Sequence, residues 1–238
     1  MAGLDPLIRT LEARGTLIPL QKEAIARLKI VEREYRPGED LIKEGDYPRS
    51  SIAILKGTVF RYRIVGEGRR QITAFHIPGD LPDLQALFLK RMDHSLAAAS
   101  ESVTAAHIPH DSITQLLDTD PLLAQLLWRL TLIDAAVFRE WIVNIGRRDA
   151  VRRTAHILCE LMFRMRAVGL AEQDSCKLAI TQTHLSDALG LSLVHVNRSL
   201  KELREKKLIS LRQGLLTIHG WKALVEIADF DPAYLHLK

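Results

Sequence analysis

The stretch from residue 181 to residue 203 restricts the fold of this chain more than any other. Thr181 or Thr183 can cap a short helix, Gly190 permits a tight turn, and Ser192 can cap a second helix. In both predicted helices the apolar residues recur at helical spacing, so each helix has one face for a core. The stretch therefore predicts a helix-turn-helix. Its core-facing residues are Leu185, Ala188, Leu189, Val196, Leu200 and Leu203.

The second predicted helix leaves a mostly polar face outside this core. An α-helix fits the major groove of DNA, and side chains near its N-terminus reach the base edges. Arg198 can form paired bonds with guanine or hold a phosphate, and Asn197 can pair with adenine or bond the backbone. An ordinary surface charge is the alternative for Arg198. The residues that we expect at DNA are Thr181, Thr183, Ser192, Leu193, Val194, His195, Asn197, Arg198 and Lys201.

A hairpin signal follows the helix-turn-helix directly. Two β-prone runs flank Gln213 and Gly214, and a hairpin after a recognition helix forms a wing. Arg212 and Gln213 at its tip are expected to contact the sugar-phosphate backbone. Residues 147–212 hold thirteen Lys and Arg against seven Asp and Glu. This basic segment favours a polyanion as partner, although a solvated surface explains the charge alone equally well.

Composition indicates a soluble protein of the reducing cytoplasm. The chain has 238 residues, 47% of them hydrophobic and 26% charged, which suits one large domain or two modest ones. No apolar run approaches the roughly 18 residues that span a bilayer, so we expect no membrane partner. The N-terminus lacks the pattern of a secretory signal. Cys159 and Cys176 cannot build a disulfide framework; Cys159 suits a buried helix face, and Cys176 a polar loop where it is either inert or oxidisable.

The first half of the chain has a different pattern of residues. Residues 5–27 predict one or two short helices. Residues 31–109 alternate short β-rich runs with Gly and Pro, which is typical of an antiparallel roll or barrel. The expected strands include residues 40–42, 51–55, 58–65 and 71–77.

A long helix is predicted over residues 121–146, followed by a second amphipathic helix over residues 150–166. Gly146 suits a hinge or a helix C-cap. One face of the long helix predicts a dimer seam, and a second face can pack on the roll. A core helix within a single chain explains the same periodicity equally well. The seam residues are Leu123, Leu126, Leu130, Ile133 and Val137, and the second face holds Leu122, Leu132 and Ala136.

With these motifs in place, the chain resembles the Crp/Fnr family of transcription regulators over nearly its whole length. The resemblance implies an α+β fold with an N-terminal antiparallel β-roll, a double-stranded β-helix like those that bind cyclic nucleotides, over residues 1–120. It implies a dimerisation helix and hinge over 121–146 and a C-terminal winged helix-turn-helix over 147–238. It also implies a homodimer, a pseudo-palindromic operator in double-stranded DNA and a contact with RNA polymerase. The matching residues are 36–39, 42–46, 54–57, 78–80, 181–203 and 208–209, with 194–198, Trp221, 229–232 and 234–235 similar to one large branch.

The chain departs from the family pattern in its effector pocket. Members that bind cyclic AMP carry Gly-Glu for the ribose and Arg-Ser/Thr for the phosphate, whereas Asp93 and His94 hold the second pair of positions here. A carboxylate there repels a phosphate, so we predict no tight binding of cyclic AMP; the effector, if any, is unknown. Members that read TGA have Glu where Val194 stands, which predicts a different DNA target. The degenerate pocket comprises Gly79, Asp80, Asp83, Leu84, Asp93, His94 and Ser95.

Two other function classes remain open from the sequence. A β-roll can hold a metal as cupin enzymes do, and a roll can also regulate a partner protein without DNA. No carboxylate joins the histidines at a metal-ligand spacing, and iron–sulfur clusters generally need four thiolates. No Ser-His-Asp, Walker or dinucleotide-binding motif is present, so we expect no enzyme, catalytic residue, metal or cofactor. The candidate metal-binding histidines are His76, His94, His107 and His110.

Overall fold

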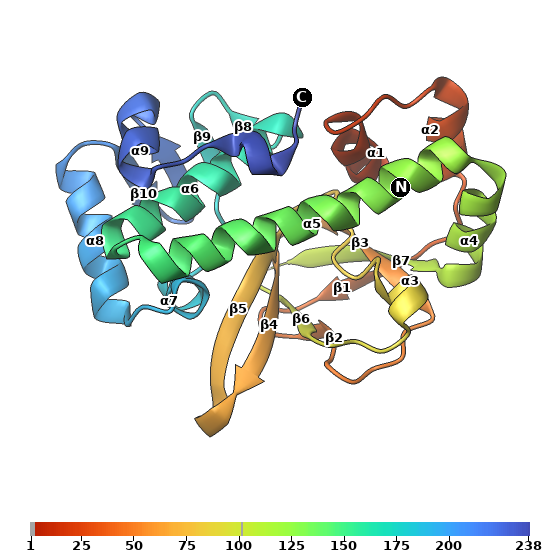
Figure 1. Cartoon of the computed structure of the whole chain (residues 1–238), viewed down its shortest axis with the longest axis horizontal. Helices are drawn as coiled ribbons and strands as arrows, with labels where there is room; N and C mark the ends of the chain where they lie inside the picture. The colour runs from red at the N-terminus through yellow and green to blue at the C-terminus, as the bar shows by residue number, and fades with distance from the viewer. Residues whose placement is uncertain (1–2, 101) are drawn as a thin grey trace. The chain divides into compact units, whose positions relative to one another are not determined.

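A computed structural model describes residues 3–100 and 102–238, and its elements follow the predicted order of roll, long helix and helix-turn-helix (Figure 1). The predicted α+β fold class is confirmed. The chain divides into two compact units: one holds the residues up to 63 together with 74–135, and the other holds 64–73 and 136–237. Helix α5 (Pro121–Arg147), the long green helix of Figure 1, contributes to both.

Two antiparallel sheets build the roll, with strand orders β1-β7-β3 and β2-β6-β4-β5. Their inner faces enclose an apolar core that includes Ile52, Ile54 and Val59. Strand alternation places these side chains inward, as the sequence analysis expects of β-rich runs. The elements up to this point are α1 (Asp5–Glu12), α2 (Pro19–Ala26), β1 (Val31–Tyr35), β2 (Asp40–Ile42), β3 (Ser50–Lys56), β4 (Val59–Val65), η1 (Gly66–Gly68), β5 (Arg69–His76), α3 (Ala86–Leu89), β6 (Ser95–Ala98), β7 (Val103–Pro109) and α4 (His110–Thr119).

At Gly79 of the roll, both the backbone conformation and the lack of room for a Cβ require glycine. Gly79 has a φ of +99°, a conformation that side chains with a Cβ rarely adopt. A Cβ at this position would also collide with the Thr10 hydroxyl and the Pro6 carbonyl of α1. The turn at Gly79, the first residue of the degenerate effector pocket, therefore packs directly on α1.

Helix α5 differs from its prediction in two respects. It continues through Gly146 to Arg147, and the break falls at Asp149, whose carboxylate accepts from the Arg152 N–H and caps the next helix. Gly146 is therefore not a C-cap, because an N-cap side chain three residues later defines the boundary. By length and composition α5 is also apolar enough to cross a membrane, and only 28% of its most apolar window is buried inside this chain.

The C-terminal part packs three helices and a four-stranded sheet around α6. The sheet has the order β10-β11-β9-β8. Cys176, expected in a polar loop, lies instead on β9, which pairs with β8 and, through Cys176 and Leu216, with the wing. Strands of two and three residues carry no alternation signal of their own. The elements are α6 (Ala150–Ala167), β8 (Ala171–Glu172), β9 (Ser175–Lys177), α7 (Gln182–Leu189), α8 (Leu193–Glu205), β10 (Ile209–Arg212), β11 (Leu215–Ile218), α9 (Trp221–Ala228) and η2 (Pro232–Leu235).

A buried carboxylate fixes the C-terminal segment to this core. Glu160 of α6 accepts from the Trp141 indole N–H at 2.9 Å and from the Tyr234 hydroxyl at 2.8 Å, while Arg164 lies 3.3 Å away. Phe230 and Tyr234 also contact the ring of His156. The aromatic residues near the C-terminus thus hold α6 in place beneath the helix-turn-helix.

Candidate nucleic-acid interface

Helix α7 begins and ends as its sequence predicts. The Thr181 hydroxyl accepts from the His184 N–H at 3.1 Å, and the Thr181 N–H donates to His184 Nδ1 at 3.2 Å. This reciprocal pair satisfies two N–H groups at the helix start. Gly190 ends the helix with a φ of +61°. Thr183 lies exposed in the first turn, so of the two candidate caps Thr181 is the one used.

Helix α8 starts at a cap of the same kind. The Ser192 hydroxyl lies 3.3 Å from the His195 N–H and 2.8 Å from His195 Nδ1. Val196, Leu200 and Leu203 are buried, so the helix has a fixed inner face. The cap and the core together set which side chains point outward.

The outward face of α8 carries the residues expected at DNA. Leu193, Val194, His195, Asn197, Arg198 and Lys201 are all exposed. Lys201 lies 3.6 Å from Glu205 on its own helix, whereas Arg198 forms no ion pair among the described residues. The guanidinium of Arg198 is therefore the group on this face whose charge is not offset within the protein.

The wing is a two-residue hairpin. Gln213 and Gly214 have φ values of +50° and +76°, and Arg212 pairs with Leu215 across the turn. Positive φ at both turn residues matches the right-handed twist of the strands, which explains the Gly at the second position. Arg212 and Gln213 are exposed at the tip.

A basic hollow beside the wing escaped the sequence analysis. It has a volume of about 500 Å³ and lies between the end of α8 and strand β10. Lys207 was visible as half of a Lys-Lys pair, but only the fold brings residues of α8, β10 and the end of β11 together. The charged or titratable side chains that line it are Arg204, Lys207, Arg212 and His219.

The residues of the degenerate effector pocket lie mostly inside the roll. Asp83 is buried, its carboxylate accepts from the Ile52 N–H at 2.7 Å, and burial raises its pKa to about 7. Asp80 accepts from the Ile77 N–H, Ser95 accepts from the Glu44 N–H, and Leu84 belongs to the apolar core. Asp93 alone is exposed, and it lies 2.6 Å from His94 Nδ1. Burial, followed by the nearby Arg61, lowers the pKa of His94 to about 4.

Arg61 is the residue of this region that the sequence analysis missed. It is 3% exposed, and its guanidinium donates to Asp134 of α5 at 2.8 Å and to the Pro82 carbonyl at 2.6 Å. The signal was the strand alternation itself, because Arg61 is two residues from the buried Val59 and faces the same side. The buried cation in the roll is thus paired by the protein.

The histidines proposed for a metal do not form a metal site. His76 and His94 are buried, whereas His107 of β7 forms a hydrogen bond of 2.6 Å with the Tyr35 hydroxyl of the neighbouring strand β1. No group of three or more metal-ligating side chains lies together in the described part of the chain. His76 ends β5, His94 precedes β6, His107 lies on β7 and His110 begins α4. The four side chains are therefore not gathered at one place.

Both cysteines are buried rather than reactive. Cys176 lies on β9, not in a polar loop, and burial raises its pKa to about 11. Cys159 is enclosed on α6, and burial raises its pKa to about 12. A thiol that stays protonated is a poor nucleophile and a poor metal ligand.

The burial of the two apolar faces of α5 within the protomer differs from the expectation. Leu123, Ile133 and Val137 are buried within the protomer, so they cannot form an open seam, and Leu126 and Leu130 pack against its core. Ala136 is buried as expected, but Leu122 and Leu132 are 69% and 54% exposed. Sequence periodicity identifies two stripes and does not say which one the protomer covers. We define the outer stripe of α5 as Trp128, Leu132, Ala135, Arg139 and Ile142, which recur every three or four residues.

Comparison with known proteins matches both halves of the chain. A family model of the cyclic nucleotide-binding domain matches residues 32–120, and one of the Crp-like helix-turn-helix domain matches residues 152–227. The chain is similar to the fumarate and nitrate reduction regulatory protein of Vibrio cholerae (30% identity; 96% of this chain, 97% of that protein). It is similar to the anaerobic regulatory protein of Haemophilus influenzae (31% identity; 87% and 81%).

Solved structures agree with these matches. FixK2 from Bradyrhizobium japonicum superimposes with a TM-score of 0.76 at 25% identity, over 84% of this chain and 98% of that one. A CooA mutant from Carboxydothermus hydrogenoformans, at 16% identity and a TM-score of 0.66, shares the fold over 93% of this chain and 95% of its own.

Proposed function

Because the chain belongs to the Crp/Fnr family of DNA-binding transcription regulators, we propose that it acts in the cytoplasm as a homodimer on a pseudo-palindromic operator. Each α8 enters the major groove of one half-site, and the two-fold symmetry of the dimer sets half-sites about one helical turn apart. RNA polymerase is the second partner that we propose, on the resemblance of the whole chain to this family. A cupin-like enzyme is not favoured, because the histidines are dispersed.

The exposed face of α8 is the observation that carries this proposal. Its N-terminal turns present Val194, Asn197 and Arg198 from a helix that is capped and packed on its inner side. Arg198 suits guanine O6 and N7, and Val194 suits apolar contact with a thymine methyl. Arg204, Lys207 and Arg212 around the basic hollow suit the phosphates beside the half-site.

The outer stripe of α5 supports the homodimer. It leaves Trp128, Leu132 and Ile142 exposed along one side of a single helix. A seam of this spacing buries its apolar side chains against the same seam of a second copy. Leu132→Asp places a charge in the seam and should convert the dimer to a monomer in analytical ultracentrifugation.

We also propose that cyclic AMP is not the effector. In the roll, Arg61 is engaged by Asp134, and Asp93 adds a carboxylate where a phosphate would bind. Repulsion and the loss of a free cation both oppose a cyclic phosphate. Isothermal titration with cyclic AMP and cyclic GMP tests this, and an affinity tighter than about 10 micromolar, roughly −7 kcal/mol, would overturn it.

Selection of bound fragments from random DNA, followed by affinity measurement on the selected site, tests the DNA-reading role. Arg198→Ala should weaken binding by about 1–3 kcal/mol and relax the preference at one base of each half-site. Lys43→Ala, which removes an exposed cation from the roll, is the matched control for net charge and should leave affinity unchanged. An Arg198→Ala footprint and sequence preference identical to the parent would remove Arg198 from DNA reading.

A further inference from the structure

We propose that the apolar groove between α3 and α5 receives the outer stripe of α5 from a second copy of this chain. Helix α3, which lies in the sequence between residues of the degenerate effector pocket, is then part of the dimer interface. This inference rests on the proposed dimer and goes beyond a helix-to-helix seam.

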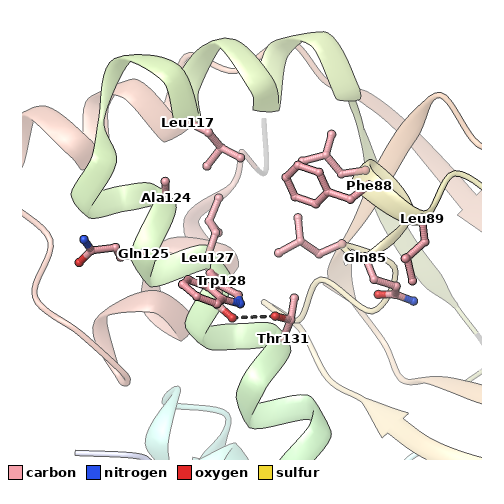
Figure 2. A pocket seen from close by; sticks show the side chains of 11 residues that line it. Gln85, Phe88, Leu89, Leu117, Ala124, Gln125, Leu127, Trp128 and Thr131 are labelled. Carbon is pink, nitrogen blue, oxygen red and sulfur yellow. Dashed lines mark hydrogen bonds between the residues drawn. The ribbon is translucent and has the colours of Figure 1, made fainter.

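The groove is hollow, open and almost entirely apolar (Figure 2). Its volume is about 490 Å³, and Phe88 of α3 lies across it from Leu127 and Trp128 of α5, with Leu89 also in its lining. The amide of Gln125 points away from the space in Figure 2. The Thr131 hydroxyl donates to the Trp128 carbonyl at 2.7 Å, so it is already satisfied by its own helix. The walls therefore offer few polar groups to orient a polar ligand.

Three of the largest wall residues are largely exposed in the protomer. Phe88 is 74% exposed, Leu89 is 67% exposed and Trp128 is 64% exposed. Exposed apolar side chains gathered in one place mark an interaction site more often than scattered ones do. Covering them is favourable because it removes apolar surface from water.

Continuity with the outer stripe identifies a second copy as the cover. Trp128 belongs to both surfaces: it lines the groove and begins the run of exposed residues that continues through Leu132 to Ile142. In a two-fold interface the same patch meets itself, so a second α5 lying along the stripe passes beside the groove at this level. The apolar side chain that it presents there is its own Trp128, the first residue of its outer stripe.

The area needed by a stable dimer points the same way. Specific interfaces bury about 800 Å² per partner. The stripe on one helix includes Arg139 and the small Ala135, which add little apolar area. Aromatic side chains bring on the order of 150–250 Å² each, so covering Phe88 adds a substantial share to the area of the stripe. A contact between Phe88 and the second copy's Trp128 also resembles the central anchors of known interfaces.

This arrangement gives α3 a direct influence on dimerisation. The helix lies in the segment from Gly79 to Ser95, which holds the residues of the degenerate effector pocket. A change in the conformation of that segment would move Phe88 and alter the fit of the second copy.

Cross-linking between mixed subunits tests the proposal. One subunit carries Phe88→Cys and the other carries Trp128→Cys, with different affinity tags, and a short bis-maleimide is added to the mixed dimer. Cys159 and Cys176 are buried with raised pKa values and stay unreactive, so the full chain can be used unchanged elsewhere. We expect a covalent mixed dimer, and none when Lys43→Cys replaces Phe88→Cys. An unlinked mixture in which ultracentrifugation still shows dimers overturns the proposal.

A second measurement distinguishes the contact at the groove from dimerisation through the outer stripe of α5. Phe88→Ser should raise the dimer dissociation constant at least tenfold, whereas Leu132→Asp, which tests the α5 seam, should abolish dimerisation. If Phe88→Ser leaves the dissociation constant unchanged while Leu132→Asp abolishes the dimer, the groove inference fails and the proposed function stands. Stoichiometric binding of an apolar dye to the intact dimer, lost in Phe88→Ser, would instead assign the groove to a small molecule and also overturn it.

Discussion

Removing either partner of the ion pair between Arg61 and Asp134 should lower the stability of the protein by a different amount. Arg61 is 3% exposed, whereas Asp134 is 34% exposed. The two charges are therefore desolvated to different degrees, and removing one leaves the other in a very different environment.

Asp134→Asn leaves the buried guanidinium without its carboxylate, although the Pro82 carbonyl still accepts from it. Removing one partner of a buried pair costs about 3–5 kcal/mol, and the remaining bond favours the lower end. Arg61→Met keeps most of the side-chain volume and leaves a carboxylate that reaches water, so its cost is closer to the ~1 kcal/mol of an exposed pair. The double variant Arg61→Met with Asp134→Asn removes both charges and should recover most of the loss.

Urea unfolding at fixed protein concentration measures all three variants, because the stability of a dimer depends on concentration. We expect Asp134→Asn to be the least stable of the set and the double variant to be more stable than Asp134→Asn alone. If Arg61→Met is as destabilising as Asp134→Asn, desolvation of the guanidinium does not govern this pair. A double variant whose loss equals the sum of the single losses would show that the two residues are not coupled.

Three further predictions follow from single contacts. Ser192→Ala removes the cap of α8 and should cost about 1 kcal/mol in thermal unfolding, while Ser192→Asp retains it; equal losses would show that the hydroxyl is not a cap. Gly79→Ala should be far more destabilising than Gly38→Ala, because both have positive φ but only Gly79 has Thr10 and Pro6 within reach of a Cβ; equal unfolding midpoints would refute the packing argument. The pKa of His94 is lowered to about 4 in the folded chain. Between pH 6.5 and 4 the unfolded chain therefore binds a proton at this residue that the folded chain does not bind. Its contribution to stability is complete above pH 6.5 and is lost as the pH falls toward 4, and His94→Gln should reduce the loss of stability between pH 7 and 5; an unchanged loss in urea unfolding would contradict this.

The helix-turn-helix could be predicted from the sequence because its determinants are local. Thr181, Gly190 and Ser192 act on the backbone within three residues of themselves, and Val196, Leu200 and Leu203 recur on one turn-by-turn face. The wing turn at Gln213 and Gly214 is equally local. Capping, turn geometry and amphipathic spacing are properties of neighbouring residues, so the chain alone specifies them.

The faces of α5, the short strands β8 and β9, and the partner of Arg61 were decided by tertiary structure. Periodicity marks two apolar stripes on α5, but which one is covered depends on what packs beside it. Cys176 lies in a strand because Leu216 is its neighbour across 40 positions of sequence. Arg61 is tolerated inside the roll because Asp134 arrives from a distant helix. Long-range burial and charge pairing are properties of the folded surface, and no local pattern encodes them.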